Sequence, residues 1–300
     1  MYLDHFGLWE MPFGLTPDTG FTYRASAHSE ALATLRVALR GGEGFNKITG
    51  EVGTGKTLLC RTLLATLAAE AEVVSAYLPN PKLTPRELLR ALARELRLRN
   101  DRRLAETDLH GILEAGLLAL AAQGRTVVLC IDEAQAMPPE TLEALRLLSN
   151  LETEKRKLLQ IVLFGQPELD AQLATPLGRA LASRIGFAAQ LAPLRRRELG
   201  HYLSHRMSVA GWRGPDAFTA PARWALWWAS GGLPRKANIL AHKCLLLAYG
   251  GGGHRVRLHH AWVALRDSEF EVHPSMTVPP RHRTAAGARA ASATWAGAPT

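Results

Sequence analysis

Eight consecutive residues, Gly50 to Thr57, read GEVGTGKT and match the pattern GxxxxGK[ST]. Its glycines let the backbone fold tightly enough to aim N–H groups at phosphate oxygens, and the following helix adds a partial positive charge at its N-terminus. In this motif Lys56 would reach the β- and γ-phosphates, and Thr57 would ligate Mg²⁺. The segment predicts a P-loop that binds ATP and Mg²⁺; a chance Gly-rich turn is the alternative. The residues expected to bind the nucleotide are Gly50, Glu51, Val52, Gly53, Thr54, Gly55, Lys56, Thr57, Leu58, Asp132 and Arg235.

Two adjacent carboxylates, Asp132 and Glu133, follow the apolar run of residues 126–131. Such a run is typical of a strand covered on both faces, and open α/β sheets bind ligands at the carboxyl ends of their strands. Asp132 can hold the Mg²⁺ shell, and Glu133 can polarise the water that attacks the γ-phosphate. Taken alone, the pair could equally be the acidic start of a helix. The P-loop upstream favours the catalytic interpretation.

Two further polar residues are placed to sense the γ-phosphate. Gln166 ends the apolar run of residues 158–164, so its amide would touch the γ-phosphate or the attacking water; an ordinary strand-to-helix turn is the alternative. Arg235 begins a helix, where a cation opposes the helix dipole. An incoming phosphate explains this position better than a surface charge does.

Arg184 precedes the last apolar run of the first part of the chain. We expect it to cross a subunit interface and neutralise transition-state charge in a neighbour's site. Arg179 on the same segment is a rival, and a solvated arginine at a helix end is the alternative. The predicted catalytic residues are Lys56, Glu133, Gln166, Arg184 and Arg235, and the predicted metal ligands are Thr57 and Asp132.

Hydrophobic periodicity predicts the elements that position these residues. Up to residue 193, strand-like runs alternate with helical patterns, which implies an α/β fold with a parallel sheet between helices. Thr84 followed by Glu87 predicts a capping box. The predicted strands are 45–49, 73–78, 126–131, 158–164 and 187–191, and the predicted helices 29–40, 56–70, 84–98, 104–123 and 138–151. The later segments 195–210, 217–230, 234–249 and 258–269 all have helical spacing.

This change of pattern predicts the domain organisation. Residues 1–40 form an aromatic leader and a first helix packed on the core, and residues 41–193 form the nucleotide-binding domain. Residues 194–272 form an all-helical lid domain, and residues 273–300 a disordered basic tail.

Composition limits the class of protein. The chain has 300 residues, 47% of them hydrophobic and 21% charged, which excludes a disordered chain. Its net charge of +9 suits anionic partners but does not establish DNA binding. Three scattered cysteines, Cys60, Cys130 and Cys244, fit a reducing compartment. We find no signal peptide and no run of about 20 apolar residues, so we expect a cytoplasmic protein.

The order of the motifs resembles that of an AAA+ ATPase with its helical lid. Over about residues 1–270 the chain further resembles the general secretion pathway protein A (ExeA) family, and within it the members for MSHA-type pilus biogenesis. The resemblance is carried by FGLWEMPFGLTPD (6–18), GEVGTGKT (50–57), NPKLTPRELL (80–89), IDEAQ (131–135), FGQPEL (164–169) and GGLPRKANILAHKCLLLAYG (231–250).

This resemblance implies an ATPase that supports assembly of an envelope pilus or secretion machine from the cytoplasmic side. It implies a homo-oligomer, either a ring or an ATP-dependent assembly, with inner-membrane pilus or secretion proteins as partners. Secretion-type members continue into a transmembrane helix and a peptidoglycan-binding domain. This chain shows neither, so we expect it to reach the membrane only through a partner. Two alternatives stay open: a regulatory ATPase that binds duplex DNA, which is not favoured, and a nucleotide-gated scaffold with little turnover.

Overall fold

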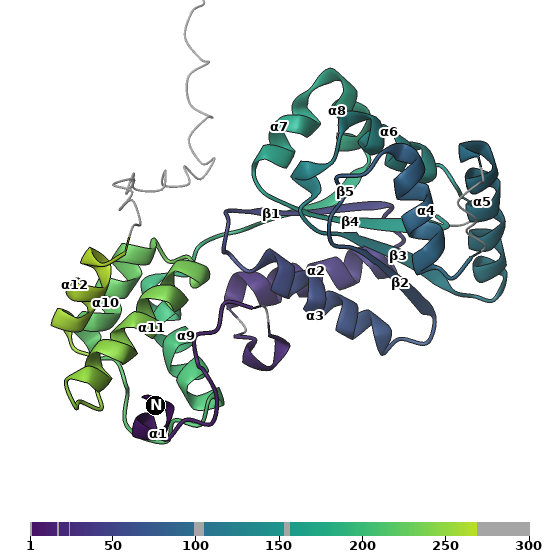
Figure 1. The fold of residues 1–300 in the computed structure, drawn as a ribbon. Helices are drawn as coiled ribbons and strands as arrows, with labels where there is room; N and C mark the ends of the chain where they lie inside the picture. Colours follow the sequence, from purple (N-terminus) through teal and green to yellow (C-terminus); the bar gives the residue numbers. More distant parts are fainter. Residues whose placement is uncertain (1, 17, 24, 99–104, 153–156, 269–300) are drawn as a thin grey trace, which may run out of the picture. The chain divides into compact units, whose positions relative to one another are not determined.

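A five-stranded parallel sheet lies at the centre of the first part of the chain (Figure 1). The computed structural model describes residues 2–16, 18–23, 25–98, 105–152 and 157–268. The strand order is β2-β3-β4-β1-β5, and every pairing is parallel. The strands are β1 (Phe45–Gly50), β2 (Val73–Leu78), β3 (Thr126–Ile131), β4 (Leu159–Gly165) and β5 (Ile185–Leu191).

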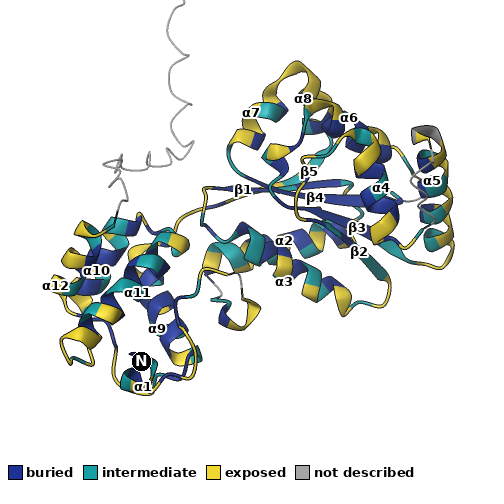
Figure 2. Cartoon of the chain, viewed as in Figure 1, coloured by how far each residue is buried: buried dark blue, intermediate teal, exposed yellow. Residues whose placement is uncertain are grey.

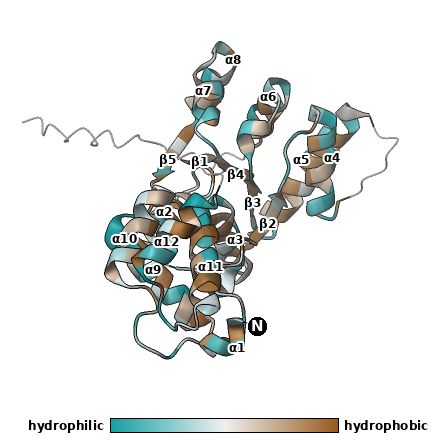
Figure 3. Ribbon diagram, turned by 60° about the vertical axis from the view of Figure 1, so that its left-hand side comes forward, coloured by the Kyte–Doolittle hydropathy of each residue, from teal (hydrophilic) through white to brown (hydrophobic). Residues whose placement is uncertain are grey.

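Two hydrophobic cores cover the two faces of this sheet. Successive side chains of a strand point to opposite faces, so Val127 and Leu129 enter one core while Val128 and Cys130 enter the other. The strands β3 and β4 are accordingly buried along almost their whole length (Figure 2), and most of their residues are apolar (Figure 3). Their continuous hydrophobic runs confirm the expectation of a sheet buried on both faces.

Helices from both sides supply the other half of each core (Figure 1). On one face lie α2 (Ser26–Arg40) and α3 (Lys56–Ala68), and on the other α4 (Pro85–Glu95), α5 (Glu106–Ala122) and α6 (Pro139–Leu148). The predicted capping box is present, because Thr84 accepts from the Glu87 N–H and the Glu87 carboxylate accepts from the Thr84 N–H. Two short helices were not predicted: α7 (Glu168–Ala174) and α8 (Pro176–Ala182).

Residues 194–268, here called the helical region, contain no named strand among their elements. The elements are α9 (Arg196–Val209), α10 (Ala220–Ser230), α11 (Pro234–Gly250) and α12 (Leu258–Arg266). They enclose a third core of their own. Within the described part of the chain, no helix combines the length and the hydropathy needed to cross a bilayer. The predicted tail 273–300 lies outside the described residues, as do Leu104 and Glu269.

The N-terminal leader packs against the helical region, which corrects one expectation. Its helix α1 (Tyr2–Phe6) and its 3₁₀ turn η1 (Thr19–Phe21) contribute aromatic side chains to the third core. Phe13 meets Phe218 edge-on at 5.7 Å between ring centroids. The prediction that residues 1–40 pack on the nucleotide-binding core holds for α2, whereas the aromatic side chains before it belong to the third core, although η1 also contacts α3. The leader is apolar enough for either surface, and its sequence does not distinguish them.

Candidate nucleotide-binding and hydrolysis site

The ends of three neighbouring strands bring the predicted polar residues to one edge of the sheet. The P-loop follows β1, Gln166 follows β4, and Asp132 follows β3. Because β4 lies between β1 and β3, the Gln166 strand separates the phosphate-binding loop from the acidic pair. All three strands run in the same direction, so their carboxyl ends form one edge, where open α/β sheets bind ligands.

Two glycines allow the P-loop its shape. Gly53 and Gly55 have φ angles of +85° and +99°, a left-handed conformation that residues with side chains rarely adopt. A Cβ on Gly53 would lie 2.8 Å from Cβ of Arg235, and one on Gly55 would lie 3.0 Å from Nε2 of His28. These glycines therefore also permit the close approach of α11 and α2 to the loop.

Lys56 is held by its own loop. Its Nζ donates to the carbonyl of Gly50 at 2.7 Å and to that of Glu51 at 3.0 Å. An ammonium has three N–H donors, so one remains for a phosphate oxygen. Burial lowers the pKa of Lys56, and the carboxylates of Glu133 and Asp132 oppose this shift. The lysine is thus placed among two carboxylates and an anion-binding loop.

Thr57 and Asp132 offer oxygen ligands that suit Mg²⁺. The Thr57 hydroxyl is hydrogen-bonded to the Asp132 carboxylate, and Asp132 is buried. Burial raises the pKa of Asp132, and the hydrogen bond with Thr57 opposes that rise. Among the described residues, no group of three or more His, Cys, Asp or Glu could hold a metal alone. One hydroxyl and one carboxylate fit Mg²⁺ bound chiefly to nucleotide phosphates and water.

Glu133 is oriented by two amide side chains. Nε2 of Gln135 donates to Oε2 of Glu133 at 2.6 Å, and Nε2 of Gln166 donates to the same oxygen at 3.1 Å. Burial by itself raises the pKa of Glu133, but the bonds from Gln135 and Gln166 bring it below its usual value. The carboxylate is therefore ionised at neutral pH, the state that a general base requires.

A cavity of about 170 Å³ collects most of the predicted residues. The P-loop lines it together with Glu133 and Gln166 from the sheet edge and Arg235 from α11. The backbone N–H of Arg235 donates to the carbonyl of Gly53 at 3.3 Å, which attaches the start of α11 to the P-loop. This contact places Arg235 on the same cavity as Lys56, so both cations are available to bind phosphate there.

Several residues of this cavity were missed by the sequence analysis. The leader contributes Gly14, Leu15, Thr16 and Asp18, and the helical region contributes Tyr202, Arg206 and Asn238. Arg206 is buried, donates to the Pro12 carbonyl and to the Tyr202 hydroxyl, and lies 4.7 Å from the Phe21 ring centroid. Asn238 accepts from the Tyr202 hydroxyl at 2.7 Å and donates to the Gly14 carbonyl at 3.3 Å. The only signal in the sequence for Tyr202, Arg206 and Asn238 is that each is a polar residue within a helical pattern of apolar residues.

A second, more apolar cavity of about 390 Å³ adjoins the first. The second extends to Tyr23 and His28, and the residues that line both cavities are Gly55, Leu58, Tyr202, Arg206 and Pro234. Its apolar walls and its place beside the P-loop suit the base of a nucleotide.

Arg184 lies elsewhere. It directly precedes β5, so it stands at the amino edge of the sheet, opposite the P-loop. Nη1 of Arg184 donates to the Ser149 hydroxyl at 2.9 Å and also to the Asn150 side chain, both just beyond α6. The rival Arg179 is exposed and bonds the Ala174 carbonyl. Neither arginine lines the cavity formed by its own P-loop.

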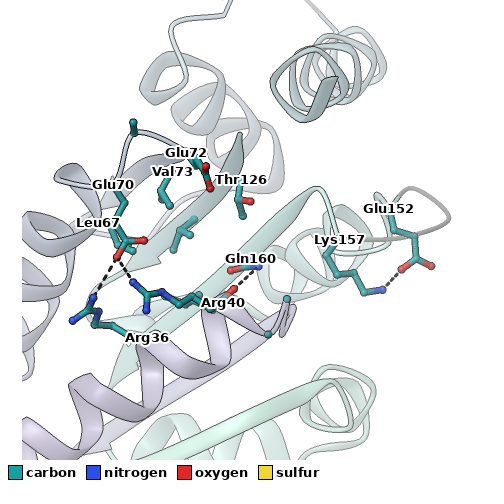
Figure 4. A pocket seen from close by; sticks show the side chains of 15 residues that line it. Arg36, Arg40, Leu67, Glu70, Glu72, Val73, Thr126, Glu152, Lys157 and Gln160 are labelled. Atoms are coloured by element: carbon teal, nitrogen blue, oxygen red, sulfur yellow. Dashed lines mark hydrogen bonds and ion pairs between the residues drawn. The ribbon is translucent and has the colours of Figure 1, made fainter. Parts of the chain in front are cut away.

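A larger cavity of about 1300 Å³ also lies away from the P-loop, beside the start of β2 and β3 (Figure 4). Arg36 and Arg40 from α2 pair there with Glu70, at 3.5 Å and 3.2 Å. Lys157 pairs with Glu152. None of the predicted site residues lines this cavity.

Comparison with known proteins identifies a homologue. Residues 39–173 match the AAA domain family. General secretion pathway protein A of Aeromonas hydrophila is 44% identical over 256 residues, which cover 85% of this chain and 46% of that protein. The chain is thus homologous to general secretion pathway protein A and spans about half the length of this relative.

Solved structures show the same fold at low sequence identity. Cdc6p of Pyrobaculum aerophilum superposes with a TM-score of 0.63 at 17% identity, covering 80% of this chain and 68% of the other. The Aeropyrum pernix ORC1 protein, solved in complex with DNA, gives 0.61 at 20%, with coverages of 86% and 69%. The Thermotoga maritima RuvB branch migration motor gives 0.53 at 16%, with 84% and 72%. The chain has the AAA P-loop NTPase fold, as the motifs predicted.

Proposed function

We propose that this protein hydrolyses ATP with Mg²⁺ to support assembly of an envelope secretion or pilus machine. The observation that carries the hydrolytic part is the Glu133 carboxylate, held by two amides and kept ionised on a cavity that the P-loop also lines. Nucleotide binding alone does not require a carboxylate oriented in this way. A general base does.

The residues of the cavity have separate roles in hydrolysis. The P-loop N–H groups and Lys56 bind the phosphates, and Mg²⁺, held by Thr57 and Asp132, would neutralise charge on the β- and γ-phosphates. Glu133 accepts a proton from the attacking water through Oε1, since both amides bind Oε2. Gln166 and Arg235 contact the γ-phosphate, and Arg235 transmits its presence to α11. The nucleotide's base occupies the adjoining apolar cavity.

The machine that uses this energy is inferred from the homologue. General secretion pathway protein A is named for secretion, and its 44% identity extends over 85% of this chain. We assign the protein to the same kind of envelope machinery, and more narrowly to MSHA-like pilus biogenesis. It acts as a homo-oligomer at the cytoplasmic side of the inner membrane, where Arg184 completes a neighbour's site.

Steady-state ATP turnover of Glu133→Gln tests the hydrolytic part. The amide keeps the size of the side chain but accepts no proton, so we expect turnover to fall about a hundredfold or more while ATP binding persists. Lys56→Ala should instead lose ATP binding. Glu140→Gln, an exposed glutamate at the start of α6, is the matched control and should retain full turnover. Unchanged turnover in Glu133→Gln would contradict the assignment.

A protein-concentration series, with and without duplex DNA, tests the role. Turnover per subunit that rises with concentration and ignores DNA supports a self-assembling envelope ATPase. Strong stimulation by DNA would contradict this role and indicate a regulatory ATPase. ATP binding without turnover at every concentration would indicate a nucleotide-gated scaffold instead.

A further inference from the structure

The positive charge of the chain is concentrated in the helical region. Residues 194–268 carry twelve Lys and Arg against three Asp and Glu, a net charge of +9 that equals that of the whole chain. Residues 1–193 carry 21 basic and 22 acidic residues and are almost neutral. An anionic surface would therefore attract the helical region, and not the sheet with its helices.

Three tryptophans are exposed on the same two helices of this region. Trp224 and Trp228 lie one turn apart on α10 and are 41% and 39% exposed. Trp262 on α12 is 44% exposed, and its ring centroid lies 6.3 Å from that of Trp228. Leu258 is 36% exposed and lies one turn before Trp262. We call these four residues the tryptophan patch; Figure 2 shows where α10 and α12 lie.

Arginines border the tryptophan patch. Arg257 directly precedes Leu258, and Arg266 lies one turn after Trp262 on the same stripe of α12; both are exposed. Neither α10 nor α12 contains an acidic residue. Asp267 follows α12, but its carboxylate pairs with Lys243 at 3.2 Å. The tryptophan patch thus places large apolar rings beside two arginines, and the helices α10 and α12 contain no acidic residue.

We propose that the tryptophan patch docks on the surface of an anionic phospholipid bilayer. Indole rings are enriched at the level of the headgroups, where an apolar ring and a polar N–H are both accommodated. Basic residues near an anionic bilayer add favourable energy, and the acyl boundary offers Leu258 an apolar medium. Duplex DNA offers phosphates to the arginines but no apolar surface for Leu258 and the indoles. The helical region therefore contacts the membrane directly.

Vesicle flotation of the full chain tests this proposal. We expect binding to vesicles of phosphatidylcholine with phosphatidylglycerol, weakening as salt is added, and none to phosphatidylcholine alone. Arg266→Glu and Arg257→Glu should each weaken the partition about tenfold. Trp228→Ala together with Trp262→Ala should weaken it by about the same factor. Arg94→Glu on α4 and Leu177→Ala on α8 replace residues that are also exposed, and should leave binding unchanged.

Three results would overturn the proposal. The first is an absence of binding to anionic vesicles by the wild-type chain. The second is an equal loss in Arg94→Glu, which would indicate attraction to net charge without a defined surface. The third is binding to duplex DNA, but not to vesicles, that the arginine variants weaken. Thermal unfolding midpoints of the tryptophan variants close to that of the wild type show that any loss is not due to unfolding.

Discussion

Gln135 is a side chain that holds the proposed general base, Glu133, in place. Its amide nitrogen donates to Glu133, and its amide oxygen accepts from the backbone N–H of Gln166 at 2.9 Å. Gln172 on α7 donates to the Gln135 carbonyl at 2.8 Å, which fixes the backbone as well. Gln135 thus joins the ends of β3 and β4 and directs one donor at the proposed base. We infer that it is a positioning residue.

Replacing this donor should change the pH dependence of hydrolysis. The hydrogen bond from Gln135 lowers the pKa of Glu133, so Gln135→Ala raises it and moves the acidic limb of the kcat profile to higher pH. We expect kcat at neutral pH to fall about tenfold with little change in ATP affinity. Gln123→Ala, at the exposed end of α5, is the control. A uniform loss of kcat without movement of the limb would indicate damage to the fold instead.

The sequence motifs predict the site residues better than they predict which other residues those side chains contact. Lys56 and Thr57 could be predicted from the motif spacing, and Asp132 and Glu133 from the apolar run before them together with the P-loop upstream, because the chemistry of phosphate and metal binding restricts the residue types at these positions. The residues that contact these side chains from distant parts of the sequence could not be identified. Asn238 reaches the Gly14 carbonyl across more than two hundred residues, and no spacing rule encodes such a bond.

At the scale of elements, a hydrogen bond from His28 on α2 supports the P-loop. Nε2 of His28 bonds to the Thr54 carbonyl at 2.9 Å, and a carbonyl only accepts, so Nε2 carries the proton. Nδ1 of His28 is buried and has no partner within the described residues. Burial lowers the pKa of His28, because protonation would place a charge and an unsatisfied N–H in this site.

This hydrogen bond predicts that acid lowers the folding stability through protonation of His28. The unfolded state binds the proton more readily than the folded state, so stability is lost as pH falls below about 6.5, the usual histidine value. His28→Gln keeps an N–H donor but does not titrate. Its stability deficit, measured by urea unfolding, should shrink on going from pH 8 to pH 5.5, by up to about 1.4 kcal/mol per pH unit. His201→Gln on the exposed side of α9 is the control, and an unchanged deficit for His28→Gln would contradict the prediction.

Elements with a strong periodic pattern could be predicted from the sequence, and weakly patterned ones could not. The ranges of β2 and β3 agree with those expected, because each is an apolar run bounded by polar residues. The short helices α7 and α8 were missed, since seven residues span barely two turns and give no clear period. The strand β5 begins two residues before the predicted start, because the exposed Gly186 separates Ile185 from the apolar run that follows.

At the scale of the whole molecule, the sheet separates Arg184 from the P-loop on the same chain. Strands of about six residues span roughly 20 Å, so a residue before β5 is too far from a phosphate bound after β1. Arg184 can therefore act on ATP only in a neighbouring subunit. Its bonds to Ser149 and Asn150 anchor the guanidinium at the end of α6, on the edge that a neighbour would have to approach.

Subunit mixing distinguishes this role from a structural one. Arg184→Ala alone should lower turnover about a thousandfold, and Lys56→Ala should do so by losing ATP. In an equal mixture, an Arg184→Ala subunit with an intact P-loop sits beside a Lys56→Ala subunit that supplies Arg184, so on the order of a quarter of the sites become complete. Turnover should therefore reappear on mixing, and the same experiment with Arg179→Ala tests the rival arginine. If Arg184 only anchors α6, each Arg184→Ala subunit carries its own defect and mixing restores nothing.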